Sequence, residues 1–120
     1  MKENVIQQKS YAFASRIVKA YKYLVSEQRE FVLSKQLLRS GTSIGANVEE
    51  ALAASSTADF VHKLNIAAKE ARETSYWLRL LHDNSFLPTS AFNSIHSHNL
   101  ELLKIIASIL LTTKNNRNNL

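Results

Sequence analysis

The sequence predicts an all-α protein that folds as an antiparallel up-down-up-down four-helix bundle, and three observations lead to this fold class. The chain has 120 residues, 45% of them hydrophobic, which suits one domain with its own core. Glycine occurs twice and proline once, too few for the many turns of a β-sandwich or barrel. Apolar residues recur at helical spacing along four long segments. Four helices joined by short connections pack as an up-down-up-down bundle.

The first two helices are predicted over residues 4–27 and 29–54. The first has an apolar stripe at helical spacing that consists of Ile6, Phe13, Ile17, Ala20 and Leu24. The stripe of the second consists of Leu33, Leu37, Ile44, Val48 and Ala51, with Ser40 or Gly41 at the missing step.

The third and fourth helices are predicted over residues 57–84 and 89–113. Ser56 and Asp59 fit a capping box, in which a hydroxyl and a carboxylate accept hydrogen bonds from free backbone N–H groups. The connection to the fourth helix contains Pro88. Residues 114–120 are polar, so we expect this tail to fray.

Small residues interrupt the second helix at Gly41, Ser43, Gly45 and Asn47. Each interior glycine costs about 1 kcal/mol relative to alanine, so the two glycines need a reason. One interpretation is close approach of a neighbouring helix, and the other is a backbone site for a phosphate. A phosphate loop would need a preceding strand, and none is visible. We therefore predict a helix-packing motif, in which Asn47 helps to fix the register.

Several classes of chemistry are disfavoured by the composition. The chain has no cysteine, so disulfides, thiolate metal sites and cysteine nucleophiles are excluded. No Glu-x-x-His motif occurs, and Asp59 with His62 is better explained as a helix start. His96 and His98 are two residues apart, so on a helix they point in nearly opposite directions. We therefore expect no metal, no cofactor and no enzymatic activity.

No segment resembles a signal peptide or a membrane span. The N-terminus lacks an apolar stretch, and the longest apolar run, residues 105–111, is broken by Ser108. A membrane span needs about 20 apolar residues. We therefore expect a cytoplasmic protein that does not enter membranes.

Positive charge is the clearest hint of function. The net charge is +5, and the isoelectric point is about 9.6. Basic residues recur every seven positions on the first helix and again on the third, so they share helix faces. The candidate nucleic-acid-binding residues are Lys2, Lys9, Arg16, Lys19, Lys22, Lys69, Arg72 and Arg79. Lys and Arg provide most of the non-specific affinity of proteins for phosphates. They are also common on any protein surface, so the alternative is a solvated face whose cations pair with glutamates.

The fourth helix is apolar over more of its circumference than one core requires. Only Glu101, Lys104 and Ser108 form a polar sector between residues 101 and 111. The surplus predicts a homo-oligomer, with candidate interface residues Leu103, Leu110 and Leu111. The alternative is a central helix that is covered within the monomer.

Two blocks of sequence resemble a known family, the four-helix bundle proteins encoded in 23S rRNA intervening sequences. The first block is LLRSGTSIGANVEEA at residues 37–51. The second comprises Asp59-Phe60, Lys63, Ile66-Ala67, KEARET at residues 69–74 and YWLRLL at residues 76–81. The two blocks occur in the order and spacing of the family.

The resemblance implies an antiparallel bundle that assembles into a ring, typically a pentamer. It also implies similarity to the accessory protein of diversity-generating retroelements, a basic barrel that binds nucleic acid and a reverse transcriptase. It supplies no catalytic residues. The chain has NVEEA at residues 47–51 where Asn-Ile-Ala-Glu-Gly is more common, which places it in a variant branch.

The sequence therefore leads to two functional hypotheses. The first is an oligomer that binds RNA or DNA non-specifically through basic helix faces, with a nucleic-acid-processing protein as a further partner. The second is a structural or adaptor protein that binds another protein.

Overall fold

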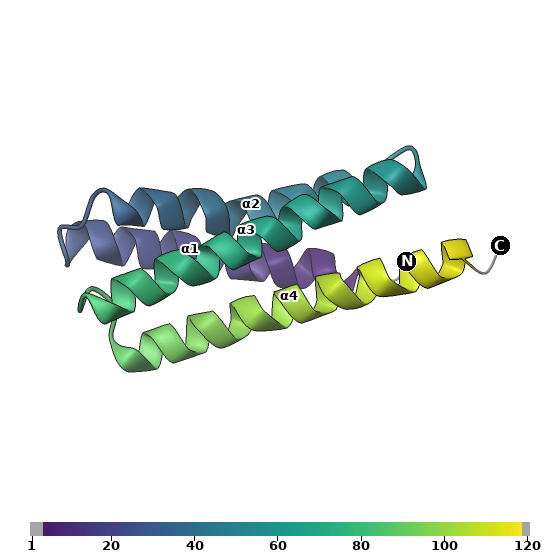
Figure 1. Cartoon of the computed structure of the whole chain (residues 1–120). Helices are drawn as coiled ribbons and strands as arrows, with labels where there is room; N and C mark the ends of the chain where they lie inside the picture. Colours follow the sequence, from purple (N-terminus) through teal and green to yellow (C-terminus); the bar gives the residue numbers. More distant parts are fainter. Residues whose placement is uncertain (1–3, 119–120) are drawn as a thin grey trace.

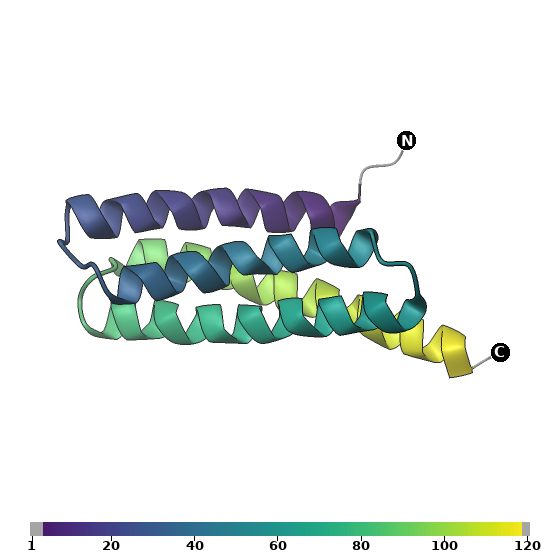
Figure 2. The ribbon, with the colours of Figure 1, turned by 90° about the horizontal axis from the view of Figure 1, so that it is seen from above.

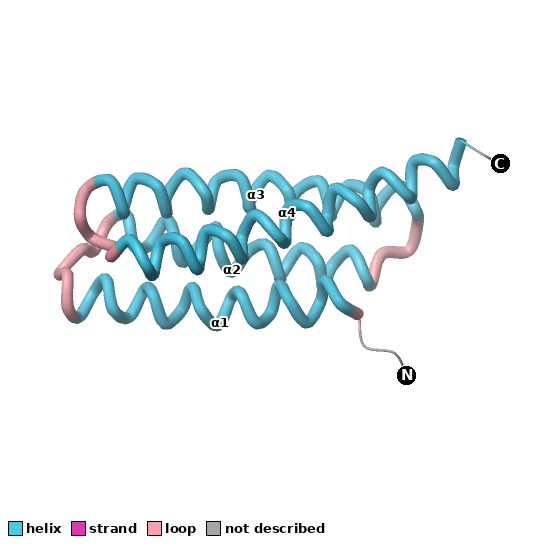
Figure 3. The backbone as a smooth tube through the Cα atoms, turned by 90° about the horizontal axis from the view of Figure 1, so that it is seen from below, coloured by secondary structure: helices cyan, strands magenta, loops and turns pink. Residues whose placement is uncertain are grey.

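The computed structural model describes residues 4–118 and confirms the fold class (Figure 1). Its four helices are α1 (Val5–Ser26), α2 (Leu33–Leu52), α3 (Thr57–Asp83) and α4 (Thr89–Asn118). Successive helices run in opposite directions, so α4 ends at the same end of the bundle where α1 begins (Figure 2). The three connections are short and lie at the two ends of the bundle (Figure 3).

Side-chain caps define the starts of α1 and α3 close to their predicted positions. The Asn4 side chain accepts a hydrogen bond from the Gln7 N–H at 3.0 Å. The Ser56 hydroxyl accepts one from the Asp59 N–H at 3.1 Å, as the capping box predicts. Each cap gives a partner to an N–H group that the first turn of a helix leaves free.

The predicted start of the second helix at residue 29 is wrong, because α2 begins at Leu33. Arg29 has a φ of 54°, which turns the chain out of the helical path. The carboxylate of Glu30 then accepts hydrogen bonds from the N–H groups of Val32, Leu33 and Ser34 at 2.8–3.1 Å. A buried carboxylate therefore caps this helix, whose last residue is Leu52 rather than residue 54.

The predicted end of the fourth helix at residue 113 is also wrong, because α4 continues to Asn118. Residues 114–118 are helical, and this end of α4 projects past the rest of the bundle (Figure 2). Leu110 and Lys114 border a groove together with Val61 and Asn65 of α3, and Leu110 is half-buried against the core. Extending an existing helix costs little, because each added residue gains one hydrogen bond.

The core lies along the bundle axis, and every helix contributes to it. Phe13, Leu37, Leu78 and Leu102 are fully buried, one from each helix. Each helix packs against its neighbours in the chain, and α1 and α4 close the bundle through the smallest of the four contacts. Among the described residues, no helix has the length and apolar character that crossing a membrane requires.

Candidate nucleic-acid interface

Part of the basic stripe of α1 faces α4 rather than open solvent. Lys9 Nζ lies 2.8 Å from Glu101 Oε1, and both side chains are about half exposed. The Arg16 guanidinium donates to the Ser94 hydroxyl at 2.7 Å and lies 3.3 Å from His98 Nδ1. Two of the predicted binding residues therefore have partners on the helix that closes the bundle. Lys2 lies outside the described residues.

The ring of His98 is enclosed in the same seam between α1 and α4. It packs edge-on against the Phe13 ring, with 5.1 Å between the ring centroids. Burial lowers the pKa of His98 below its ordinary value, and the neighbouring Arg16 cation lowers it further. At neutral pH the ring is therefore uncharged, and its Nδ1 can accept a hydrogen bond from Arg16.

The remaining basic residues of α1 are exposed, and they differ in their surroundings. Lys22 points to solvent. Lys19 is also exposed and borders a groove of about 400 Å³ that Arg16 borders as well. The predicted stripe therefore divides into two cations paired with α4 and two exposed ones.

The outer face of α3 carries the clearest group of free cations. Lys69, Arg72 and Arg79 are exposed, and none of the ion pairs found among the described residues involves them. Tyr76 lies on the same face and is 49% exposed, and the Arg79 guanidinium carbon lies 6.0 Å from the centre of its ring. These four residues, called the α3 face below, fall within an arc of about 80° at about 100° per residue.

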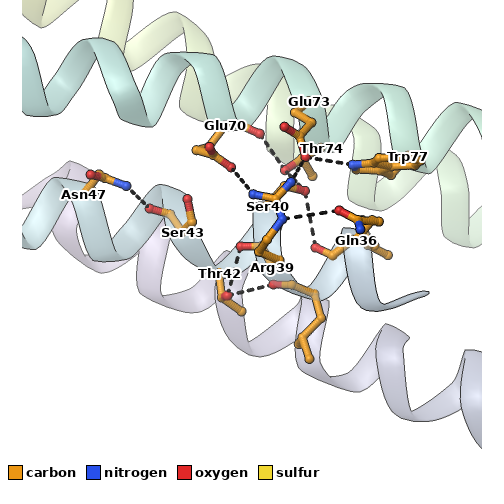
Figure 4. A network of polar contacts seen from close by, with 12 residues as sticks. Gln36, Arg39, Ser40, Thr42, Ser43, Asn47, Glu70, Glu73, Thr74 and Trp77 are labelled. Atoms are coloured by element: carbon orange, nitrogen blue, oxygen red, sulfur yellow. Dashed lines mark hydrogen bonds and ion pairs between the residues drawn. The ribbon is translucent and has the colours of Figure 1, made fainter. Parts of the chain in front are cut away.

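A polar network between α2 and α3 turns the acidic residues of α3 away from this face (Figure 4). Arg39 forms ion pairs with both Glu70 and Glu73, and Arg39 Nη1 lies 3.3 Å from Glu70 Oε2. Glu73 also accepts a hydrogen bond from the Trp77 indole N–H at 3.0 Å. Both carboxylates are paired with Arg39 of α2, and neither forms an ion pair with Lys69 or Arg72.

The two glycines of α2 face α1. A Cβ on Gly41 would lie 2.7 Å from the buried side chain of Ile17, and a Cβ on Gly45 would lie 3.3 Å from the Ser10 carbonyl oxygen. The glycines therefore let α1 and α2 approach closely, and neither takes a positive φ. Ser43 and Asn47 are half-buried, and Asn47 Nδ2 donates to the Ser43 carbonyl at 2.9 Å.

The candidate interface leucines of α4 differ in exposure. Leu103 and Leu110 are half-buried against the bundle's own core. Part of the additional apolar surface of α4 is therefore covered within the monomer. Leu111 is 59% exposed. Leu100, which the sequence did not single out, is 43% exposed and lies on the same side of the helix.

The histidines of α4 do point in different directions. His96 Nε2 lies 2.8 Å from the Ser75 hydroxyl of α3, whereas His98 contacts α1. Burial lowers the pKa of His96, and the nearby Arg79 lowers it further. Within residues 4–118, the His, Asp and Glu side chains form no group of three or more that could hold a metal ion.

The sequence did not identify Arg39 and Glu30 as important positions. Arg39 contacts carboxylates 31 and 34 positions away in the chain, and no local pattern encodes such a pair. Glu30 had a local signal, because its side chain binds N–H groups only two to four residues ahead. That signal is a glutamate three residues before the first residue of the helix, Leu33.

Comparison with known proteins places this bundle in a family. A family model described as "23S rRNA-intervening sequence protein" matches residues 2–108. A crystal structure of a protein of unknown function from the S23 ribosomal protein family of Bacteroides thetaiotaomicron VPI-5482 superimposes with a TM-score of 0.88. That chain is 55% identical, and the match covers 88% of this chain and 98% of the other. No curated protein matches the sequence. This chain therefore belongs to the 23S rRNA-intervening sequence protein family.

Proposed function

We propose that the protein is a non-enzymatic bundle that binds RNA or DNA with little sequence preference, through the α3 face. The observation that carries this proposal is the exposure of Lys69, Arg72 and Arg79 on one face without acidic partners. Phosphate contacts by such cations provide most of the affinity in sequence-independent binding. Because Lys9 and Arg16 have partners on α4, the α3 face is a better candidate than α1.

The arrangement of the α3 face suits a single strand. From Lys69 to Arg79 the helix rises about 15 Å, a length over which several phosphates of a strand can be contacted. Tyr76 lies between the cations, and an exposed aromatic ring can stack on any base. One subunit offers few cations, so we expect firm binding from a homo-oligomer in which several such faces act together.

The test is a binding titration with a labelled single-stranded RNA at about 50 and 200 mM salt. Arg72→Gln with Arg79→Gln should weaken binding. The slope of log affinity against log salt concentration should become less steep by about 0.7 for each phosphate contact that is lost. Arg29→Gln with Lys35→Gln is the matched control, because both residues are exposed, neither lies on α3 or α4, and the net charge falls equally. Equal affinity in the two double variants would refute the α3 face as the binding surface.

An adaptor protein that binds another protein remains the second candidate. The observation that favours it is the exposure of two leucines, Leu100 and Leu111, on one side of α4, because large exposed apolar side chains are candidates for contacts between proteins. Absence of salt-dependent binding to both RNA and DNA would favour this function over the first. Its partner would then be retained by the wild type and lost when these leucines are replaced by glutamate.

A further inference from the structure

A groove lies where the last turns of α1 meet the connection between α3 and α4. Its volume is about 400 Å³, which is within the range of small-molecule sites in proteins. Ala20 and Tyr23 of α1 form one wall, Leu87 comes from the connection, and Ala91 and Ile95 come from the start of α4. The groove is on the seam between α1 and α4 and shares no residue with the α3 face.

The interior of this groove is apolar and largely fixed by the fold. Leu87 and Ile95 are part of the bundle's core, with exposed fractions of 5% and 7%. Ala20 and Ala91 have small side chains, and this leaves room between the two helices. A hydrophobic group that enters the groove would remove its own apolar surface from water, which is favourable at about 25 cal/mol per Å².

The rim of the groove is positively charged. Arg16 and Lys19 both line it, and none of the described residues that line it is acidic. Arg16 is held in place by Ser94, whose hydroxyl and carbonyl oxygens lie 2.7 and 3.5 Å from the guanidinium. These contacts leave part of the guanidinium free, and a positioned guanidinium binds a carboxylate well. Lys19 is exposed and has no ion pair among the described residues.

We propose that this groove binds a small amphipathic anion, a carboxylate carried on a short aliphatic chain or an aromatic ring. The apolar part lies over Ile95, Leu87 and Ala91, and the carboxylate faces Arg16 and Lys19. Charge complementarity decides this chemistry, because two cations on an apolar groove favour an anion and disfavour a cation of the same shape. The inference is independent of nucleic-acid binding, because it uses a different surface.

The probe is octanoate, with 1-octanol and octylammonium as ligands of similar shape and different charge. In amide NMR spectra, octanoate should produce saturable shifts at Ala20, Ala91 and Ile95. Octanol should bind at least several-fold more weakly, and octylammonium should not bind. Equal binding of octanoate and octanol, or shifts spread over the whole surface, would overturn the proposal.

Two variants test the two parts of the groove. Lys19→Gln should weaken octanoate binding several-fold and leave octanol binding unchanged. The variant should fold normally, because the Lys19 side chain is exposed. Lys22→Gln is the matched control, because Lys22 is exposed on the same helix outside the groove. This variant should bind octanoate with the affinity of the wild type. Ala91→Leu should fill the interior and weaken octanoate by about tenfold or more. Unchanged octanoate affinity in Lys19→Gln would show that charge does not select the ligand.

Discussion

Gly41 shows how one missing side chain determines the distance between two helices. A Cβ at this position would lie 2.7 and 2.8 Å from two branch atoms of Ile17, a side chain that is completely buried. Ile17 has no free space into which it could move, because interiors are close-packed. The approach of α1 to α2 therefore depends on this glycine.

We predict that Gly41→Ala lowers the free energy of unfolding by about 1–2 kcal/mol. Overpacking costs about 1–3 kcal/mol, and the better helix propensity of alanine returns up to about 1 kcal/mol of this. Urea unfolding of Gly41→Ala, Ile17→Ala and the double variant measures the effect. The double variant should be less destabilised than the sum of the single changes, because Ile17→Ala removes the atoms that clash. Strict additivity would show that the glycine is not required by this contact.

Side chains that act locally could be predicted, and those with distant partners could not. Ser56 was identified from its own turn of sequence, and Gly41 and Gly45 were identified from their spacing on one helix. Arg16 was predicted to bind nucleic acid, but in the fold it contacts residues 78 and 82 positions away. Sequence periodicity assigns a residue to a face of its helix, and only packing shows which helix covers that face.

Among the elements, α4 is tied to α1 by contacts that depend on charge. Lys9 with Glu101 and Arg16 with His98 both bridge the two helices, in the smallest of the contacts between helices. The hydrogen bond from Lys9, together with its charge, lowers the pKa of Glu101. Protonation of His98 would remove an acceptor from Arg16 and bring two positive charges together.

We predict that the bundle is less stable at pH 5 than at pH 7.5. The folded pKa of His98 lies below its unfolded value, so the unfolded state binds more protons as the pH falls below about 6.5. This contribution is complete above that pH and is lost as the pH falls through the window between the two pKa values. His96 has a lowered pKa as well and acts in the same direction.

The melting temperature of wild type, His98→Gln and His62→Gln at both pH values tests this prediction. His98→Gln should lose less stability on acidification, because glutamine can accept from Arg16 and does not titrate. His62 is exposed, so His62→Gln should behave like the wild type. The pKa of Glu101 is lowered from 4.5, so the stability that its ion pair contributes is lost mainly below that pH and adds little to the difference between pH 7.5 and pH 5. An identical pH dependence in all three proteins would exclude His98 as a source.

The ends of the helices were predicted less accurately from the sequence than the helices themselves. The start of α3 followed from the capping residues Ser56 and Asp59. The start of α2 did not. Its cap is Glu30, whose side chain is longer than that of the usual capping residues, and the positive φ of Arg29 forms a turn before the helix. The end of α4 was placed too early, because the polar sequence was expected to fray, whereas a residue that follows an existing helix gains a hydrogen bond by continuing it.

At the scale of the whole molecule, the exposed part of α4 bears on assembly. Leu100 and Leu111 are 43% and 59% exposed, and the end of α4 projects from the bundle. Covering a leucine contributes about 1.5–3 kcal/mol when burial is complete. We therefore predict a homo-oligomer, as the sequence also suggested.

Light scattering during gel filtration at micromolar concentration should return a mass above the 13.6 kDa of one chain. Leu100→Glu with Leu111→Glu should shift the protein towards that monomer mass by weakening association about tenfold or more. Tyr11→Glu is the control, because Tyr11 is exposed on α1 rather than on α4, and it should assemble like the wild type. A wild type that elutes only as a monomer would contradict the prediction.

The order of the helices also bears on how the chain reaches its fold. The three largest contacts all join helices that are consecutive in the chain, and only the smallest, between α1 and α4, spans it. Loop closure over short stretches costs little entropy, and chains with mostly local contacts fold in microseconds to milliseconds. The bundle can grow hairpin by hairpin from α1 to α3. Because the contact between α1 and α4 is the smallest and joins the first helix of the chain to the last, we expect it to form last.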